Sequence, residues 1–174
     1  MSTTSPQLPK AYEPGQLEPG IRSSWDEAGV GHAVLPSDPG RTPYGILMPP
    51  PNVTSILHLG HALNATLQDI LVRHARMNGK QTMWMPGTDH AGIATQTAVE
   101  RRLHQDGKRR LDFERDEFVA LVQEWKDEYG AEILAQLREL GASCDWERTR
   151  FTMDPVCAAA VREAFFRLFT EGLI

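Results

Sequence analysis

The sequence is poor in cysteine, and it lacks the long apolar runs of a membrane protein. Its 174 residues include two cysteines, Cys144 and Cys157, and no Cys-x-x-Cys pair, which argues against a zinc knuckle. No apolar stretch approaches the roughly 18 residues of a membrane span. The first ten residues, MSTTSPQLPK, lack the charged start and apolar run of a secretory signal. The sequence therefore predicts a soluble protein of the reducing cytoplasm.

An excess of positive charge is also missing. The formal net charge is -5 and the isoelectric point is near 5.7, so no global basic field attracts nucleic acid. The one basic cluster, residues 101–110, is more simply explained as a solvated helix end. The hydrophobic fraction of 41% and the charged fraction of 24% are typical of one globular domain with a packed core.

The N-terminal half alternates turn-rich segments with short apolar ones. Residues 1–20 predict an extended arm, residues 21–28 a short helix around Trp25, and residues 35–43 a loop. Residues 44–48 form a short apolar run that suits a buried strand. Three prolines then end the strand and impose a fixed, extended path.

A strand–helix–strand unit follows from the apolar pattern. The predicted helix covers residues 58–77, and the second strand covers residues 81–85, ended by Pro86 and Gly87. The helix is expected to bury the face that carries Leu63, Leu67, Ile70 and Leu71. Because the helix serves as the crossover, the two strands should be parallel. The fold class is therefore α/β, with parallel strands and crossover helices.

Helices dominate the rest of the chain. They are predicted over residues 92–104, over residues 115–140, and from Asp154 to about Gly172. Gly130 makes a break possible in the helix over residues 115–140, and Gly141 is the expected C-terminal cap of that helix. The last helix should bury Val161, Phe165 and Leu168.

Two polar segments follow the predicted strands. Residues 49–61 read PPPNVTSILHLGH and residues 87–96 read GTDHAGIATQ. In an open parallel sheet, ligands bind outside the carboxyl ends of the strands. If the strands are neighbours, one crevice collects the polar side chains Asn52, Thr54, His58, His61, Asp89 and His90.

Each segment has a functional and an ordinary interpretation. His58 and His61 share one face at a helix N-terminus, where unpaired N–H groups favour phosphate, yet a lone His-x-x-His is also common in ordinary surfaces. The chain has neither of the usual glycine-rich phosphate loops. Asp89 suits an ammonium ligand and suits equally well the N-cap of the following helix.

Together these motifs resemble a known family. The run His58-Leu59-Gly60-His61 is similar to the His-Ile-Gly-His signature of class I aminoacyl-tRNA synthetases. PPPNVT, LHLGHAL and GTDHAGIATQ in this order resemble valyl-tRNA synthetases in particular, and LRELGASCDWER and FTMD extend the resemblance from about Leu8 to the C-terminus. The isoleucyl and leucyl relatives usually carry Gly-Trp-Asp where this chain has Gly87-Thr88-Asp89.

The resemblance implies a partial Rossmann-type fold and the formation of valyl-adenylate from valine and ATP with magnesium, followed by transfer to tRNA(Val). It implies no protein-bound metal. It assigns catalysis to His58 and His61. The signature covers Pro51, Asn52, Val53, Thr54, His58, Leu59, Gly60 and His61. Within it, Thr54 and residues 58–61 are expected to bind ATP. Asp89, Asn52 and the carbonyl of Pro50 are expected to bind valine, with Asp89 on the ammonium.

The sequence also departs from the family. Ser55 stands where glycine usually follows Asn-Val-Thr, which would cost strain if that position needs a positive φ. A Lys-Met-Ser-Lys-Ser signature is missing, and residues 21–174 leave no room for editing or anticodon-binding domains. We therefore expect the first half of a synthetase catalytic domain, with little or no ligation alone, which self-associates or is completed by another chain. Two alternatives are a non-catalytic binding module and a zinc hydrolase that uses His58, His61, Asp89 and His90.

Overall fold

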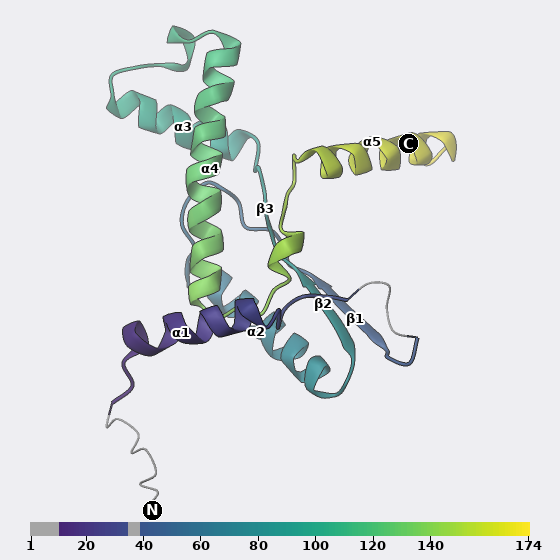
Figure 1. Ribbon diagram of the computed structural model, residues 1–174. Helices are drawn as coiled ribbons and strands as arrows, with labels where there is room; N and C mark the ends of the chain where they lie inside the picture. The colour runs from purple at the N-terminus through teal and green to yellow at the C-terminus, as the bar shows by residue number, and fades with distance from the viewer. Residues whose placement is uncertain (1–10, 35–38) are drawn as a thin grey trace, which may run out of the picture. The chain divides into compact units, whose positions relative to one another are not determined.

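The computed structural model describes residues 11–34 and 39–174, in two compact units divided after Val30 (Figure 1). The first unit contains one described helix, α1 (Pro14–Glu27), which has no buried residue. The prediction of an extended arm over residues 1–20 is therefore wrong for residues 14–20, and its first ten residues lie outside the described ones. Pro14 starts the helix because its fixed φ suits a first turn.

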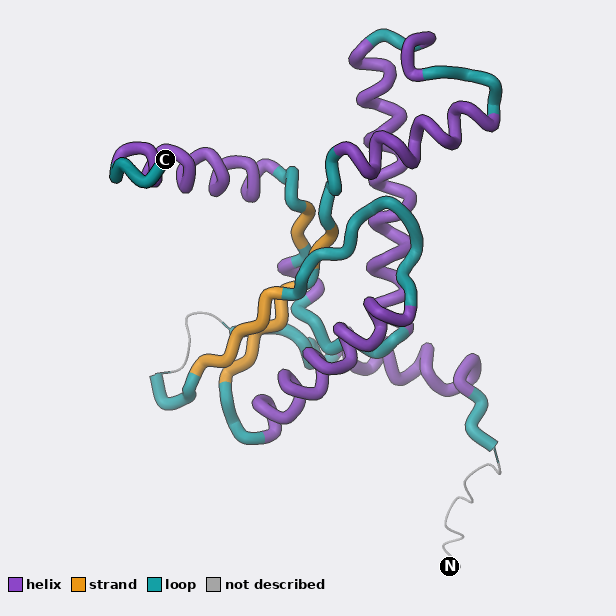
Figure 2. The backbone as a smooth tube through the Cα atoms, turned by 180° about the vertical axis from the view of Figure 1, so that it is seen from behind, coloured by secondary structure: helices purple, strands orange, loops and turns teal. Residues whose placement is uncertain are grey.

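The second unit is built around two short pairs of parallel strands, drawn in orange in Figure 2. Strand β1 (Pro43–Leu47) pairs with β2 (Gln81–Met85), with Gly45 opposite Met83. Helix α2 (Leu59–Met77) connects them, so the predicted strand–helix–strand unit and its parallel pairing are confirmed. Of the predicted loop over residues 35–43, the first four residues lie outside the described ones, and Pro43 belongs to β1.

A second strand pair was not predicted. The chain continues beyond Pro86 as β3 (Gly87–Thr88), which pairs in parallel with β4 (Arg150–Phe151). A Cβ atom at position 87 would lie 2.7 Å from the carbonyl oxygen of Arg150. Glycine therefore allows the two backbones to approach closely at this point.

The sheet is buried on one face only. Trp84 is fully buried and lies in a core cluster with Val72 of α2 and with Ile133 and Leu137 of α4 (Arg115–Glu139). On the other face, Leu47 remains 70% exposed. The prediction of a buried strand at residues 44–48 therefore holds for one face only, where Tyr44 and Ile46 pack against the core.

Helix α2 packs through a different face from the one predicted. Its buried residues are Ala65, Val72 and Ala75, whose small side chains let the helix approach the sheet closely. The predicted face is instead more than half exposed, and it comprises Leu63, Leu67, Ile70 and Leu71. The helix bounds were predicted correctly, but the assignment of its buried face was wrong.

The remaining helices occur where they were predicted. Helix α3 (Ile93–Gln105) packs against α4, and Val99, Leu103 and Phe118 form a second core cluster between them. Helix α4 runs unbroken through Gly130, which is buried and faces Val53 and Thr88. Short 3-10 turns, η1 (Arg110–Asp112) and η2 (Trp146–Arg148), precede and follow this helix. Gly141 ends it with a φ of +79°, as predicted.

Helix α5 (Pro155–Thr170) begins as predicted but buries nothing. The Asp154 carboxylate accepts a hydrogen bond from the Cys157 backbone N–H at 2.8 Å, which caps the first turn. Val161, Phe165 and Leu168, predicted to be buried, are 65%, 63% and 41% exposed. Within the ranges described, no helix has the length and apolar character needed to cross a membrane.

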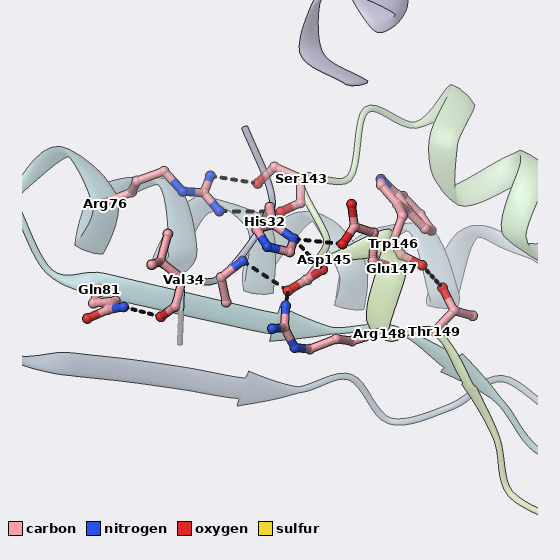
Figure 3. Close-up of polar contacts among 11 residues, drawn as sticks. His32, Val34, Arg76, Gln81, Ser143, Asp145, Trp146, Glu147, Arg148 and Thr149 are labelled. Atoms are coloured by element: carbon pink, nitrogen blue, oxygen red, sulfur yellow. Dashed lines mark hydrogen bonds and ion pairs between the residues drawn. The ribbon is translucent and has the colours of Figure 1, made fainter. Parts of the chain in front are cut away.

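A buried carboxylate ties the segment before β1 to the segment after α4, as Figure 3 shows. Asp145 is 1% exposed, and its Oδ2 accepts hydrogen bonds from the Ala33 N–H at 2.9 Å and from Arg148. His32 lies 3.7 Å from Oδ1 of the same carboxylate. Nearby, the Arg76 guanidinium donates to Thr82 and Ser143, which links α2 and β2 to this segment.

Candidate active site at the ends of the parallel strands

The two polar segments meet in the structure. Asn52 and Asp89 form a parallel β-bridge beyond the end of the β1–β2 pair. The Asp89 N–H donates to the Pro51 carbonyl at 2.7 Å, and the Val53 N–H donates to the Asp89 carbonyl at 3.0 Å. The prolines at 49–51 end the ladder of β1 without separating the segments, so residues 49–53 and 87–89 lie side by side.

Two side chains of helix α4 hold the segment that carries this bridge. The Trp125 indole N–H donates to the Val53 carbonyl at 2.9 Å. The Gln136 side chain accepts from the Leu57 N–H at 2.8 Å. Val53 itself is fully buried. One long helix therefore holds this segment at Val53 and at Leu57, while Asn52 and Ser55 remain exposed.

His58 and His61 cap helix α2 for each other. His58 is the N-cap residue, and its Nδ1 accepts from the Gly60 N–H at 3.0 Å. In return, the His58 N–H donates to Nδ1 of His61 at 3.2 Å. The two rings lie with their centroids 3.9 Å apart. This reciprocal cap satisfies N–H groups that a helix start would otherwise leave unpaired.

The cap fixes the proton positions on both rings. A ring nitrogen that accepts a hydrogen bond carries no proton, so each neutral imidazole must hold its proton on Nε2. Both rings therefore present an N–H donor beside the helix N-terminus, which already favours anions. Burial, and to a smaller extent the charge of His58, lowers the pKa of His61 below its usual 6.5. The neutral form that the cap requires is thus also the favoured one.

Gly60 is tightly placed between the two histidines. A Cβ atom at this position would lie 2.8 Å from Cε1 of His58. Gly60 and His61 also line a small cavity of about 60 Å³ together with Pro49, Pro51 and Asn64. The residues that line the cavity come from the start of α2 and from the segment that follows β1.

Asp89 is held by side chains and does not cap the following helix. The N-cap of α3 is Gly92, so the helix-cap interpretation of Asp89 is wrong. Its Oδ1 accepts from the Thr152 hydroxyl at 2.7 Å and lies 3.3 Å from Nδ1 of His90. Ala91 follows with a φ of +52°, the one positive φ of a non-glycine residue in residues 11–34 and 39–174. Ser55 therefore carries no such strain.

The structure groups the predicted site residues in two sets. His58, Leu59, Gly60 and His61 form the start of α2, and Asn52 and Asp89 form the bridge beside Pro50, Pro51 and Val53. In the described part of the chain, no hydrogen bond or ion pair joins the two sets. The same residues contain no group of three or more His, Cys, Asp or Glu placed to hold a metal, so the zinc hydrolase gains no support.

The sequence did not single out Thr152, Trp125 or Gln136. Trp125 and Gln136 belong to a helix whose pattern predicts burial, and Thr152 was visible only as part of FTMD. Their hydrogen bonds to the candidate site cross at least 62 residues of chain, so only the paired β3 and β4 and the packing of α4 reveal them.

Comparison with known proteins identifies the family of the chain. The family model described as tRNA synthetases class I (I, L, M and V) matches residues 20–174. The chain belongs to this family. It is 56% identical over 168 residues to the valine–tRNA ligase of Chlamydia felis, and 54% identical over 169 residues to that of Syntrophotalea carbinolica.

These alignments cover 96% and 97% of this chain but 18% and 19% of the two ligases, so the chain spans about a fifth of their length. A LeuRS of Agrobacterium radiobacter, solved in a ternary complex with tRNA and LeuAMS, superposes on 94% of the chain with a TM-score of 0.71. At 22% sequence identity, this likeness shows the fold alone. The class I synthetase chain therefore has the Rossmann-like arrangement of that catalytic domain.

Proposed function

We propose that this chain carries the first ATP- and valine-binding half-site of a valine–tRNA ligase. The observation that supports this most is the Asn52–Asp89 bridge, which brings the two family motifs together through two backbone hydrogen bonds. The identity of more than half of the residues to valine–tRNA ligases favours valine over the other amino acids of the family.

The amino-acid side of the site is Asp89 with Asn52 and Pro50. The Asp89 side chain is 31% exposed, and the hydrogen bonds of the described residues engage its Oδ1 and leave Oδ2 for a ligand. A carboxylate in this partly buried position suits the valine ammonium through a charge-assisted hydrogen bond. The exposed amide of Asn52 and the carbonyl of Pro50 supply the neighbouring polar contacts.

The nucleotide side of the site is the start of α2. The Nε2–H groups of His58 and His61 donate to phosphate oxygens, and the helix N-terminus adds its partial positive charge. Leu59 and Gly60 lie between them, and Leu59 is 89% exposed. Thr54 lies on the proline-led segment that precedes this helix. Magnesium arrives with ATP as part of the substrate.

The chemistry requires positioning and charge stabilisation and no covalent step by the protein. A valine carboxylate oxygen attacks the α-phosphorus in line, the bond to the β-phosphate oxygen breaks, and pyrophosphate leaves with the electron pair. Negative charge builds on the phosphate oxygens, where the two imidazole N–H groups donate. Asp89 holds the ammonium so that the carboxylate faces the phosphorus. Transfer to tRNA(Val) follows in the complete enzyme, which we place in the cytoplasm.

The exposed apolar surface fits a half-site that works within something larger. One face of α2 and the whole of α5 expose large apolar side chains. Monomeric proteins rarely leave such faces uncovered. We propose that a second copy of the chain, or a complementing chain, covers these faces.

Valine-dependent exchange of pyrophosphate into ATP tests this function, with His61→Ala as the matched variant. Exchange that the variant loses would mean that the half-site alone activates valine. Background exchange together with measurable ATP and valine binding would mean a half-site that needs further residues for chemistry. A folded chain that binds neither ligand would contradict the proposal.

A further inference from the structure

Thr152 occupies the point where β4 reaches the candidate ammonium site. Strands β3 and β4 pair Gly87 with Arg150 and Thr88 with Phe151, so one step further along the register places Thr152 beside Asp89. The Thr152 N–H donates to the Thr88 carbonyl at 3.1 Å, which continues the parallel pattern. The backbone pairing alone therefore fixes the position of Thr152 beside Asp89.

The Thr152 hydroxyl makes three hydrogen bonds at this position. It lies 2.7 Å from Oδ1 of Asp89, 3.0 Å from the backbone N of His90, and 2.7 Å from Nδ1 of His90. A hydroxyl has one proton to give and two lone pairs with which to accept. Three partners use this capacity completely, so the role of each partner is determined.

The single proton of the Thr152 hydroxyl determines the tautomer of His90. A carboxylate only accepts, and the backbone N–H only donates, so the hydroxyl proton belongs to Asp89. The remaining lone pair must then accept from His90, which places a proton on Nδ1. In the neutral ring, Nε2 is therefore an acceptor. This is the opposite tautomer to that of His58 and His61, whose Nδ1 atoms accept.

We propose that Thr152 is a positioning residue for the amino-acid site, which it serves by orienting the Asp89 carboxylate and by fixing the tautomer of His90. The inference rests on the proposed function for the identity of the ligand, a primary ammonium beside Asp89. By occupying Oδ1, the hydroxyl turns Oδ2 toward that ligand. His90 also lines a cavity of about 580 Å³ with Gly92, Phe118 and Phe151.

The nature of the residue at 152 matters for this role. The Thr152→Ser variant keeps the hydroxyl, whereas Thr152→Val keeps the shape of the side chain without a donor or an acceptor. Thr152→Val would leave Oδ1 of Asp89 and Nδ1 of His90 without their shared partner. Nδ1 of His90 would then keep only its longer, 3.3 Å contact with Oδ1 of Asp89, so the preference for a proton on Nδ1 should weaken and the carboxylate should gain freedom to rotate.

The test is long-range ¹H–¹⁵N spectroscopy of the histidine side chains in the 174-residue chain, with Thr152→Val and Thr152→Ser as the matched pair. The wild-type chain and the serine variant should show His90 protonated on Nδ1, and the valine variant should show a mixture or the Nε2–H form. His58 and His61 should stay in the Nε2–H form in all three and serve as internal controls. A wild-type His90 protonated on Nε2 would overturn the inference without any variant, as would an unchanged tautomer in a folded Thr152→Val chain.

Valine affinity measured by calorimetry gives a second readout. The Thr152→Val chain should bind the amino acid valine roughly tenfold more weakly than the wild-type chain, the size expected for losing one hydrogen bond to a charged group. The Thr152→Ser chain should keep most of the affinity. Equal affinity in all three chains would overturn the positioning role. If the wild-type chain binds no valine, the proposed half-site fails, while the tautomer of His90 still decides whether Thr152 fixes it.

Discussion

At the scale of single residues, His61 links the electrostatics of the site to the fold. Burial lowers its pKa, the charge of His58 lowers it further, and its Nδ1 must stay unprotonated to cap α2. Because the folded pKa lies below the unfolded value near 6.5, the unfolded chain binds more protons in this range. We expect the free energy of unfolding to fall as the pH drops below about 6.5, and NMR titration of His61 to show a midpoint below that of a free histidine.

The variant His58→Asn separates the two causes. Asparagine is a good N-cap, so the helix start should persist while the neighbouring charge disappears. The midpoint of His61 should rise but remain below 6.5, since burial is the larger cause. A midpoint that does not move, or that falls, would show that the charge of His58 plays no part.

The sequence pointed to the residues of the candidate site but not to the side chains that hold them in place. The motifs marked His58, His61, Asn52 and Asp89, and the structure places them at the start of α2 and on one bridge. Thr152 and Trp125 escaped notice because threonine and tryptophan carry no signal of their own. Their roles depend on which strand and which helix lie next to the site, and this is decided by contacts between distant parts of the chain.

At the scale of elements, a methyl group added at each of two glycines should change the stability in opposite directions. Gly87 lies where a Cβ would meet the Arg150 carbonyl at 2.7 Å, whereas a Cβ on Gly130 would meet Val53 at an ordinary 3.9 Å. Gly87→Ala should force β3 and β4 apart and cost about 1–3 kcal/mol of stability. Gly130→Ala should raise the stability by up to about 1 kcal/mol, because alanine is the better helix former.

Chemical denaturation of the two variants beside the wild-type chain measures this difference. Each variant is the control for the other, since both add a single methyl group to the core region. A stabilised Gly87→Ala chain would contradict the close approach of β3 and β4. A strongly destabilised Gly130→Ala chain would contradict the packing of α4.

The limits of α2, α3, α4 and α5 were predictable, but the faces that α2 and α5 bury were not. Local signals such as Asp154-Pro155 and Gly141 fix where a helix starts or ends. Which face packs depends on what lies opposite. The leucines of α2 are the more apolar stripe, yet Ala65 and Ala75 meet the sheet because small residues allow close approach. None of the residues of α5 is buried.

At the scale of the whole molecule, the exposed apolar stripe of α2 predicts self-association. Leu63 and Leu67 are 63% and 54% exposed, and the stripe continues through Ile70 and Leu71. Sedimentation velocity should show a mean mass that grows with concentration. Leu63→Lys combined with Leu67→Gln should reduce this growth, while Lys80→Gln, which changes a polar position outside the stripe, should not. A chain that stays monomeric at high concentration would contradict the prediction.

The central claim is that Asp89 binds the ammonium group of valine in a half-site that this chain forms when it folds. Calorimetric titration of valine into the wild-type chain, Asp89→Ala and the surface control Asp116→Ala tests it most directly. We expect binding by the wild-type and Asp116→Ala chains and a loss of at least about a hundredfold in Asp89→Ala, since a charge-assisted pair is broken. The Asp89→Ala chain should stay folded, because the bridge to Asn52 uses only the backbone of residue 89. Unchanged valine affinity in a folded Asp89→Ala chain would contradict the account.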